Sequence, residues 1–599
     1  METTKIPVRA DVPEQDKWAI SDLFATDDDF RAALAAAKEF APRVAAYRGR
    51  LGESGETLLA FLRLDDEINL ALDALVHYAQ RKSDEDTRVA IYQEMVSQVN
   101  RLVVEIQAAG AFETPELLAL SDETLAGFYE QTPALADYRR LIDRVRRRRD
   151  HVLSEKEEAL LAAAGEMAQS PDEIYSMLND ADMTFPDAVD AAGSAHPVTH
   201  GTYIPLMQSY DRVLRKSAFD SLYSVYGKFR NTSAATLSAQ LKSLLFFANA
   251  RKYPSTLAAA LDGSEVPTEI YHSLINAVHR SLTPMHRYVT LRKKLLGLDE
   301  LHMYDLYVPV VEGIEMKFTF DEAKETVLKA LAPLGEDYLA ILREGFSSGW
   351  IDVYENEGKR SGAYSAGAQV HPYVLLNFKG RLDDVFTLVH EMGHAIHSYL
   401  SNKNQPTAYQ NYVIFVAEVA STCNEALLME YLLSVTEDKK QRAYLINHFL
   451  EQFRGTLYRQ TMFAEFELLV NEMAQRGEGI TADALCALYK RLNAQYFGAD
   501  MVIDEEIALE WARIPHFYYD YYVYQYATGY AAAIALSRRI LREGESAVKE
   551  YLGFLSGGCA ADPITLLRGA GVDMASTAPV EAATALFDEL ISQMEALLG

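Results

Sequence analysis

Apolar residues recur at helical spacing through the first 190 or so residues of the chain. Segments 30–40 and 68–78 show the pattern best, because alanine, leucine and aromatic residues return there every three or four positions. A face of apolar residues at this spacing is typical of a helix that packs on a core. The pattern therefore predicts one amphipathic helix after another in this part of the chain.

The helical pattern changes near Phe185-Pro186, where loop and short-strand residues follow. Helical spacing returns from about Arg212. We place a domain boundary in this interval, which gives a helical N-terminal domain at 1–195 and a second domain at 196–599.

Two segments of the second domain look like strands, and two look like buried helices. The strand-like segments are 307–311 and 373–378, which are rich in valine, leucine and tyrosine. A helix is predicted over 384–400, and a second, largely apolar helix over 413–425 after a loop at 401–406. The chain is thus predicted to be mainly α, with a small β-sheet just before the 384–400 helix.

Composition excludes several classes of function. The 599 residues are 49% hydrophobic, which sustains a large core, and carry a formal net charge of −29. So acidic a protein is poorly suited to bind nucleic acid or an anionic membrane. The cysteines, at 423, 486 and 559, are too widely spaced for a disulfide framework, and no apolar run reaches 18 residues. No apolar signal region opens the chain. We expect a cytoplasmic protein with neither nucleic acid nor membrane as a partner.

The predicted helix at 384–400 contains a His-Glu-x-x-His motif. His390 and His394 are four residues apart, so their side chains lie on one helix face and can bind one Zn²⁺ ion per chain. Glu391 can reach a zinc-bound water and take its proton. No proline interrupts the helix between positions 372 and 406. The motif predicts a zinc hydrolase that cleaves amides.

The third zinc ligand has to come from outside the motif. His397 lies two turns, about 10 Å, beyond the first histidine and is expected to support or pack rather than bind the metal. Leu400 stands where a metzincin has its third histidine. Residues 395–417 hold no acid, and the first is Glu418, in a helix so apolar that a carboxylate is costly unless paired or metal-bound. Glu418 is therefore the predicted ligand, a salt bridge being the alternative, and Glu425 on the same face could orient a ligand histidine.

These motifs and their surroundings resemble peptidase family M3, the thimet oligopeptidase and neurolysin group, and most closely its bacterial oligoendopeptidase F branch. The matching segments are the zinc motif with Phe415–Ser421, the stretches 359–365 and 371–378 before it, the tyrosine-rich segment after His516, and Trp18–Phe24 near the start. The resemblance covers nearly the whole chain. It implies that His390, His394 and Glu418 bind zinc and that Glu391 is the general base.

The resemblance also implies an architecture. We expect a helical zincin of the gluzincin type, with a deep cleft or channel that admits short unstructured peptides and excludes folded proteins. The strand at 373–378 is expected to be an edge strand that pairs with the extended peptide, a purely structural strand being the alternative.

A tyrosine-rich segment follows His516, with seven tyrosines in the next fourteen residues. Phenol and imidazole donors can stabilise the oxyanion formed in amide hydrolysis, each worth roughly 3 kcal/mol. If the segment is one helix, His516, Tyr519 and Tyr526 share a face. Tyr521 or Tyr522 could take the place of Tyr519. Related M3 enzymes supply a histidine and tyrosines from this region.

The predicted function is that of a zinc-dependent oligoendopeptidase, which hydrolyses internal bonds of short peptides with a water activated by Glu391. One alternative is a carboxypeptidase or dipeptidase on the same scaffold, with Arg360, Lys379 or Arg381 binding the terminal carboxylate. The other is a non-catalytic helical protein with a structural zinc, which the scarcity of cysteines and the presence of Glu391 argue against. The oligomeric state is not predicted.

Overall fold

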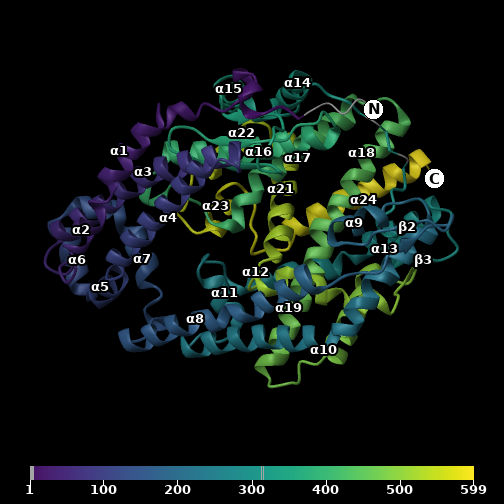
Figure 1. The fold of residues 1–599 in the computed structure, drawn as a ribbon, viewed down its shortest axis with the longest axis horizontal. Coiled ribbons are helices and arrows are strands. Elements are labelled where there is room, and N and C mark those ends of the chain that lie inside the picture. Colours follow the sequence, from purple (N-terminus) through teal and green to yellow (C-terminus); the bar gives the residue numbers. More distant parts are fainter. Residues whose placement is uncertain (1–5, 312, 315, 599) are drawn as a thin grey trace. The chain divides into compact units, whose positions relative to one another are not determined.

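The structure is a computed structural model that describes residues 6–311, 313–314 and 316–598. Helices make up most of the ribbon, and strands are few and short (Figure 1). The predicted mainly α fold is confirmed. Contacts divide the chain into two compact units, each built from three separate segments. The first unit comprises Met1–Asp150, Glu315–Tyr431 and Leu536–Gly571, and the second comprises His151–Ile314, Leu432–Ala535 and Val572–Gly599. The predicted boundary near residue 195 stays a prediction.

The first unit holds the N-terminal helices and the helix of the His-Glu-x-x-His motif. Its helices are α1 (Asp27–Ala37), α2 (Phe40–Ala45), α3 (Gly55–Glu85), α4 (Ala90–Gly110), α5 (Glu113–Ala119), α6 (Asp122–Gln131), α7 (Arg139–Arg146), α14 (Phe320–Ala330), α15 (Gly335–Ser347), α16 (Leu382–Asn404), α22 (Glu545–Leu555) and α23 (Pro563–Gly569). Helix α17 (Ile414–Val435) belongs to this unit as far as Tyr431, and α21 (Tyr524–Glu543) belongs to it from Leu536.

Amphipathic spacing and side-chain caps explain the N-terminal helices. Thr26 and Ser54 accept hydrogen bonds from backbone N–H groups in the first turns of α1 and α3. Phe30 of α1 stacks on Tyr78 of α3, with ring centroids 5.3 Å apart, inside a continuous apolar core. The helices predicted at 30–40 and 68–78 are thus present, although α1 ends at Ala37 and a second helix starts at Phe40.

A small three-stranded sheet lies in the first unit, in the order β4 (Ile351–Asp352), β6 (Tyr373–Leu375), β5 (Tyr364–Ala366). Strand β4 pairs parallel with β6, and β5 pairs antiparallel with it. The edge-strand prediction for 373–378 is therefore wrong, because β6 is the central strand and β5 is at the edge. The uniform burial of β6 explains the difference, since a short apolar run buried on both faces is typical of a central strand.

The second unit is also mainly helical. Its helices are α8 (Glu155–Ser176), α9 (His200–Met207), α10 (Arg212–Ala250), α11 (Thr256–Asp262), α12 (Thr268–Arg280), α13 (Leu282–Leu295), α18 (Lys439–Gln452), α19 (Arg459–Gln475), α20 (Ala482–Phe497), the start of α21, and α24 (Ala578–Leu598). Its strands form two short pairs, β1 (Ala188–Val189) with β2 (Ala195–His196), and β3 (Leu301–His302) with β7 (Met501–Val502).

The strand pattern of the second unit was predicted only in part. Short strands do follow Phe185-Pro186, and α10 starts at Arg212, but α9 already precedes it. Segment 307–311 is not a strand. Pro309 cannot donate a ladder hydrogen bond, and the carbonyl of Val308 accepts one from the guanidinium of Arg292 at 2.7 Å.

Within the part of the chain that the structure describes, none of the helices has the length and apolar character needed to cross a bilayer.

Candidate metal centre and tyrosine cluster

Helix α16 carries the His-Glu-x-x-His motif as predicted. The backbone N–H of Arg381 donates to Asp384 at 2.7 Å, and acidic residues in the first turn suit the positive end of the helix dipole. Val389, Met392 and Ile396 are fully buried and fix the inner face of the helix. The predicted loop at 401–406 starts only at Gln405, because Ser401 is fully buried and extends the helix to Asn404.

The predicted ligands come together at one point. The Nε2 atoms of His390 and His394 are 3.1 Å apart, and an oxygen of Glu418 lies 3.4 Å and 3.5 Å from them. Among the described residues this is the one group of three or more His, Cys, Asp or Glu side chains whose ligand atoms could hold a metal ion. A tetrahedral zinc with bonds of about 2.0–2.2 Å places its ligand atoms about 3.3–3.6 Å apart. The two distances to Glu418 fall in this range and the distance between the two histidines lies slightly below it, so the group fits the ion in donor chemistry and closely in spacing.

Gly393 explains how Glu418 reaches the histidines. A Cβ at this position would lie 2.6 Å from Cα and 2.8 Å from N of Ser421, so the backbones of α16 and α17 nearly touch here. Asn424 donates to the carbonyl of Val389 at 3.3 Å and to the hydroxyl of Tyr338 at 2.9 Å. The missing side chain and these bonds hold α17 against the motif. Sequence reasoning missed Gly393, although a glycine inside so regular a helix was the available signal.

Glu425 orients His390, as predicted for a residue on the Glu418 face. Its carboxylate is hydrogen-bonded to Nδ1 of His390, which leaves Nε2 directed toward His394 and Glu418. Burial by itself lowers the pKa of His390, but the hydrogen bond and charge of Glu425 outweigh it and raise that pKa to about 9. Burial likewise opposes ionisation of Glu418, yet the two histidines bring its pKa down to about 2. Attraction between the imidazoles and the carboxylates thus contributes to holding these side chains together.

Glu391 lies between the two motif histidines along α16, His397 lies beyond them, and the two residues differ in character. Glu391 is 8% exposed, and burial raises the pKa of its carboxyl group against the pull of both motif histidines. A raised pKa suits a proton acceptor that must later release the proton. His397 is 1% exposed and stacks on Tyr412 with ring centroids 3.8 Å apart. Burial lowers its pKa to about 3, so it is a neutral packing residue.

His516 lies at the centre of a tyrosine cluster in the second unit. Its ring centroid is 5.7 Å from that of Tyr519, 6.2 Å from Tyr522 and 6.1 Å from Tyr526. Burial lowers the pKa of His516, so its imidazole is neutral at pH 7 and retains one N–H donor. The structure therefore brings the predicted histidine and both predicted tyrosines together, with Tyr522 as a further member.

The choice of His516, Tyr519 and Tyr526 assumed one continuous helix, but the structure does not form one over this segment. Pro515–Tyr518 is a 3-10 turn, and α21 begins only at Tyr524. Asp520 and Tyr521 lie between them with φ of 52° and 59°, in the left-handed region. Glu467 accepts the N–H of Tyr521 at 2.6 Å and stabilises this turn. Neither residue is a glycine, so nothing in the local sequence indicated that both would adopt the left-handed conformation.

The turn also places Tyr521 and Tyr522, the two alternatives to Tyr519, in different surroundings. Tyr521 is 1% exposed, and its hydroxyl lies 2.9 Å from that of Thr256, so it packs inward. Tyr522 stacks on His516 at an interplanar angle of 17°. Tyr519 is 48% exposed. Of the two alternatives to Tyr519, only Tyr522 lies in the cluster.

Comparison with known proteins identifies the family. A model described as "Peptidase family M3" matches residues 205–586, and one described as "Oligopeptidase F" matches residues 116–185. The chain belongs to peptidase family M3. It is 48% identical over 595 residues to the oligopeptidase PepF of Bacillus subtilis (strain 168), which covers 99% of this chain and 89% of that protein. The predicted membership is thereby confirmed.

Two further members extend this picture. The group B oligopeptidase PepB of Streptococcus agalactiae serotype III (strain NEM316) is 40% identical over 99% of this chain and 98% of its own length. The crystal structure of oligoendopeptidase-F from Enterococcus faecium superposes with a TM-score of 0.74, is 36% identical, and covers 95% of this chain and 99% of that one. The M3 fold therefore extends over almost the whole chain.

Proposed function

We propose that this M3 peptidase is a zinc-dependent oligoendopeptidase that hydrolyses internal bonds of short unstructured peptides. The observation that carries the proposal is the convergence of His390, His394 and Glu418 beside the buried Glu391. Two imidazoles and one carboxylate are the ligand set of catalytic zinc sites that keep a fourth position open. The relatives named as oligopeptidases support the same substrate class.

His390, His394 and Glu418 would hold one zinc ion per chain. When bound, zinc supplies a Lewis acid that lowers the pKa of water to about 7 and polarises the peptide carbonyl. The carboxylate of Glu391 takes the proton from the attacking water and passes it to the leaving amine. Glu425 keeps Nδ1 of His390 hydrogen-bonded and so fixes the ring for ligation through Nε2.

The peptide is proposed to lie along β5 rather than along β6. Strand β5 is paired on one side only, by β6, and it runs beside α16. An extended peptide can add to such an edge through main-chain hydrogen bonds, which favour any sequence that is not already folded. Recognition of the backbone fits an enzyme that acts on many short peptides.

His516, Tyr519 and Tyr526 are proposed as the donors that stabilise the oxyanion, with Tyr522 as the alternative to Tyr519. Support comes from the resemblance to M3 enzymes and from the neutral imidazole of His516 within the tyrosine cluster. A neutral imidazole N–H and phenolic O–H groups are suitable donors for a developing negative charge.

The proposed location is the cytoplasm. Among the described residues, no disulfide bond joins the three cysteines, which fits a reducing compartment.

The decisive experiment combines Glu391→Gln with peptides blocked at both ends. The wild-type protein loaded with zinc should cleave blocked, internally quenched peptides, and Glu391→Gln should retain one zinc per chain while hydrolysis falls by several orders of magnitude. Metal analysis and fluorescence give the two readouts. Cleavage of unblocked peptides alone would favour the carboxypeptidase or dipeptidase alternative, and full activity of Glu391→Gln would refute the mechanism.

A further inference from the structure

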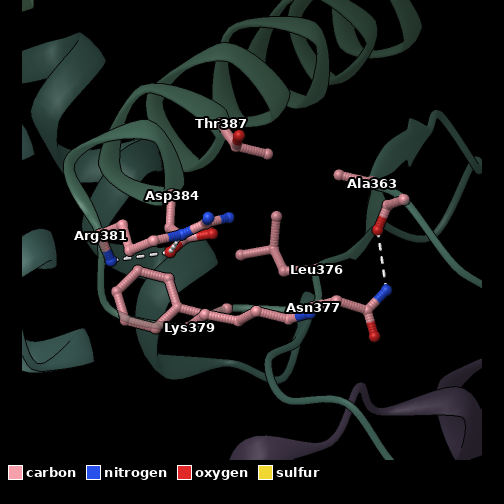
Figure 2. Close-up of a pocket in the computed structure, with 9 residues that line it drawn as sticks. Ala363, Leu376, Asn377, Lys379, Arg381, Asp384 and Thr387 are labelled. Carbon is pink, nitrogen blue, oxygen red and sulfur yellow. Dashed lines mark hydrogen bonds and ion pairs between the residues drawn. The ribbon is translucent and has the colours of Figure 1, made fainter. Parts of the chain in front are cut away.

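A cavity of about 280 Å³ lies between the N-terminal end of α16 and the segments that flank β5 and β6, all within the first unit. Figure 2 shows Ala363 on one side, Arg381 and Asp384 on the other, and Leu376 between them. The lining side chains that matter here are those of Ala363, Asn377, Lys379, Arg381, Asp384 and Thr387. No part of the mechanism above uses them.

The walls of the cavity are fixed by specific bonds. The amide of Asn377 donates to the carbonyl of Arg360 at 3.0 Å and to that of Gly362 at 2.8 Å, which ties the segment before β5 to the end of β6. Gly380 has φ of 79°, and a Cβ there would lie 2.7 Å from the carbonyl oxygen of Phe318. This turn places Lys379 and Arg381 on the cavity with little freedom in their backbone.

The cavity offers two cations in a strongly acidic protein. The ammonium of Lys379 lies 3.5 Å from Glu355, and Nε of Arg381 lies 3.7 Å from Asp384, so both ion pairs are loose. Among the described residues, neither cationic group forms a hydrogen bond with a protein acceptor. Asp384 already accepts the backbone N–H of Arg381. The ammonium and guanidinium donors are therefore available to another carboxylate.

The cavity lies along the proposed path of the peptide. Ala363, just before β5, and Thr387 of α16 line the same cavity. A Cβ on Gly367, just after β5, would lie 2.4 Å from Cβ of Ser398, which lies further along α16. Strand β5 and α16 thus run side by side in the same direction. Along α16, the motif histidines lie between Thr387 and Ser398. Thr387 is five residues, or about 7.5 Å, before the midpoint of His390 and His394, which equals about two residues of an extended peptide.

The direction of the peptide follows from the pairing rules of sheets. Antiparallel neighbours outnumber parallel ones two- to threefold. A peptide antiparallel to β5 has its C-terminal side at the start of β5, where Ala363 borders the cavity. The second residue after the cleaved bond then lies over Lys379 and Arg381.

We infer that this cavity is a substrate subsite for a carboxylate, carried by the second residue after the cleaved bond and bound by Lys379 and Arg381. The carboxylate is either an aspartate or glutamate side chain or the C-terminus of a peptide that ends at this residue. The inference rests on the proposed peptidase function and names a substrate class for it.

The test compares blocked, internally quenched peptides that differ only by Asp or Asn at the first, second or third residue after the cleaved bond. For the wild-type holoenzyme, kcat/KM should be about fivefold higher for Asp at the second position, mainly through KM, as expected for partly exposed ion pairs. The double variant Lys379→Gln/Arg381→Gln should bring this ratio to about one and leave kcat/KM for the Asn peptide within about twofold. Lys403→Gln removes one exposed charge from the far end of α16 and should keep the fivefold ratio.

A second arm uses peptides that end at the second residue, as the free acid or as the amide. An acid-to-amide ratio larger than the Asp-to-Asn ratio, and lost in the double variant, assigns the terminal carboxylate as the natural ligand. If the Asn peptide is cleaved but both ratios are near one, or if both survive in the double variant, the subsite assignment is wrong. If the wild-type holoenzyme cleaves none of the peptides, the proposed function fails and the subsite falls with it.

Discussion

The metal group and the tyrosine cluster hold their side chains in opposite ways. His390, His394 and Glu418 project from two regular helices, at positions that helical periodicity fixes. The cluster around His516 is formed by a 3-10 turn, a left-handed pair and the first turn of α21. Regular helices set ligand spacing through their own geometry, whereas the irregular segment depends on partners elsewhere in the fold. The two regions should therefore respond differently to substitution.

The largest expected effect is that of Glu418→Ala. Removal of one of the three proposed ligands should lower zinc affinity by more than about a hundredfold and abolish peptide hydrolysis. About a hundredfold is the upper range for loss of a residue that only orients a ligand. Zinc content after dialysis, measured with hydrolysis of a blocked peptide, provides the check. A variant with one zinc per chain would show that the third ligand is another residue.

The next largest effect is expected at His516. If His516 is an oxyanion donor as proposed, His516→Ala should lower kcat by about 10²–10³-fold while zinc content stays at the wild-type value. Tyr519→Phe and Tyr522→Phe, assayed in parallel, show which of the two hydroxyl groups contributes, because each substitution retains the ring. If His516→Ala loses zinc as well, the tyrosine cluster and the metal group do not respond independently to substitution.

The smallest effect should be a change in the pH dependence of stability. Glu467 is 2% exposed, and burial raises its pKa to about 8. The folded state therefore retains a proton that the unfolded state loses above about pH 4.3, so stability should fall as pH rises from about 5 to 8, by at most about 1.4 kcal/mol per pH unit.

In Glu467→Gln this decline should be absent, since the amide oxygen can still accept the N–H of Tyr521 and no buried acid remains. Urea midpoints at pH 5 and pH 8 test this. The matched control is Glu472→Gln, which removes a half-buried acid from the same helix. Asn471→Asp would not serve, because Asn471 is itself buried. Equal slopes for wild type and Glu467→Gln would contradict the role of Glu467.

The sequence predicted most of what periodicity can encode. The helices and the place of the motif on α16 follow from spacing along one element. Glu418 was predicted instead because it is the first acid after the motif and because the M3 resemblance implies it. The place of 373–378 within its sheet did not follow from spacing either, because the order of strands depends on pairing with Ile351 and Tyr364, which lie in other segments of the chain.

The tyrosine cluster shows the same limit in another form. His516, Tyr519 and Tyr526 do lie together, yet the continuous helix that led to their choice does not exist. The left-handed pair at Asp520 and Tyr521 is stabilised by Glu467, more than fifty residues earlier. The conformational propensity of the local sequence cannot indicate so distant a partner.

The hydrogen atom that stands for a side chain at Gly393 sets how closely helices α16 and α17 approach each other. With backbones this close, the carboxylate of Glu418 moves as a rigid part of α17, and ligand atoms 3.1–3.5 Å apart suit bonds of about 2.0–2.2 Å. A methyl group at this position would meet the backbone of Ser421 at 2.6 Å, so α17 would have to move outward and carry Glu418 away from the two histidines. The contact between two backbones thus acts as a spacer for side chains that meet a full helical turn away.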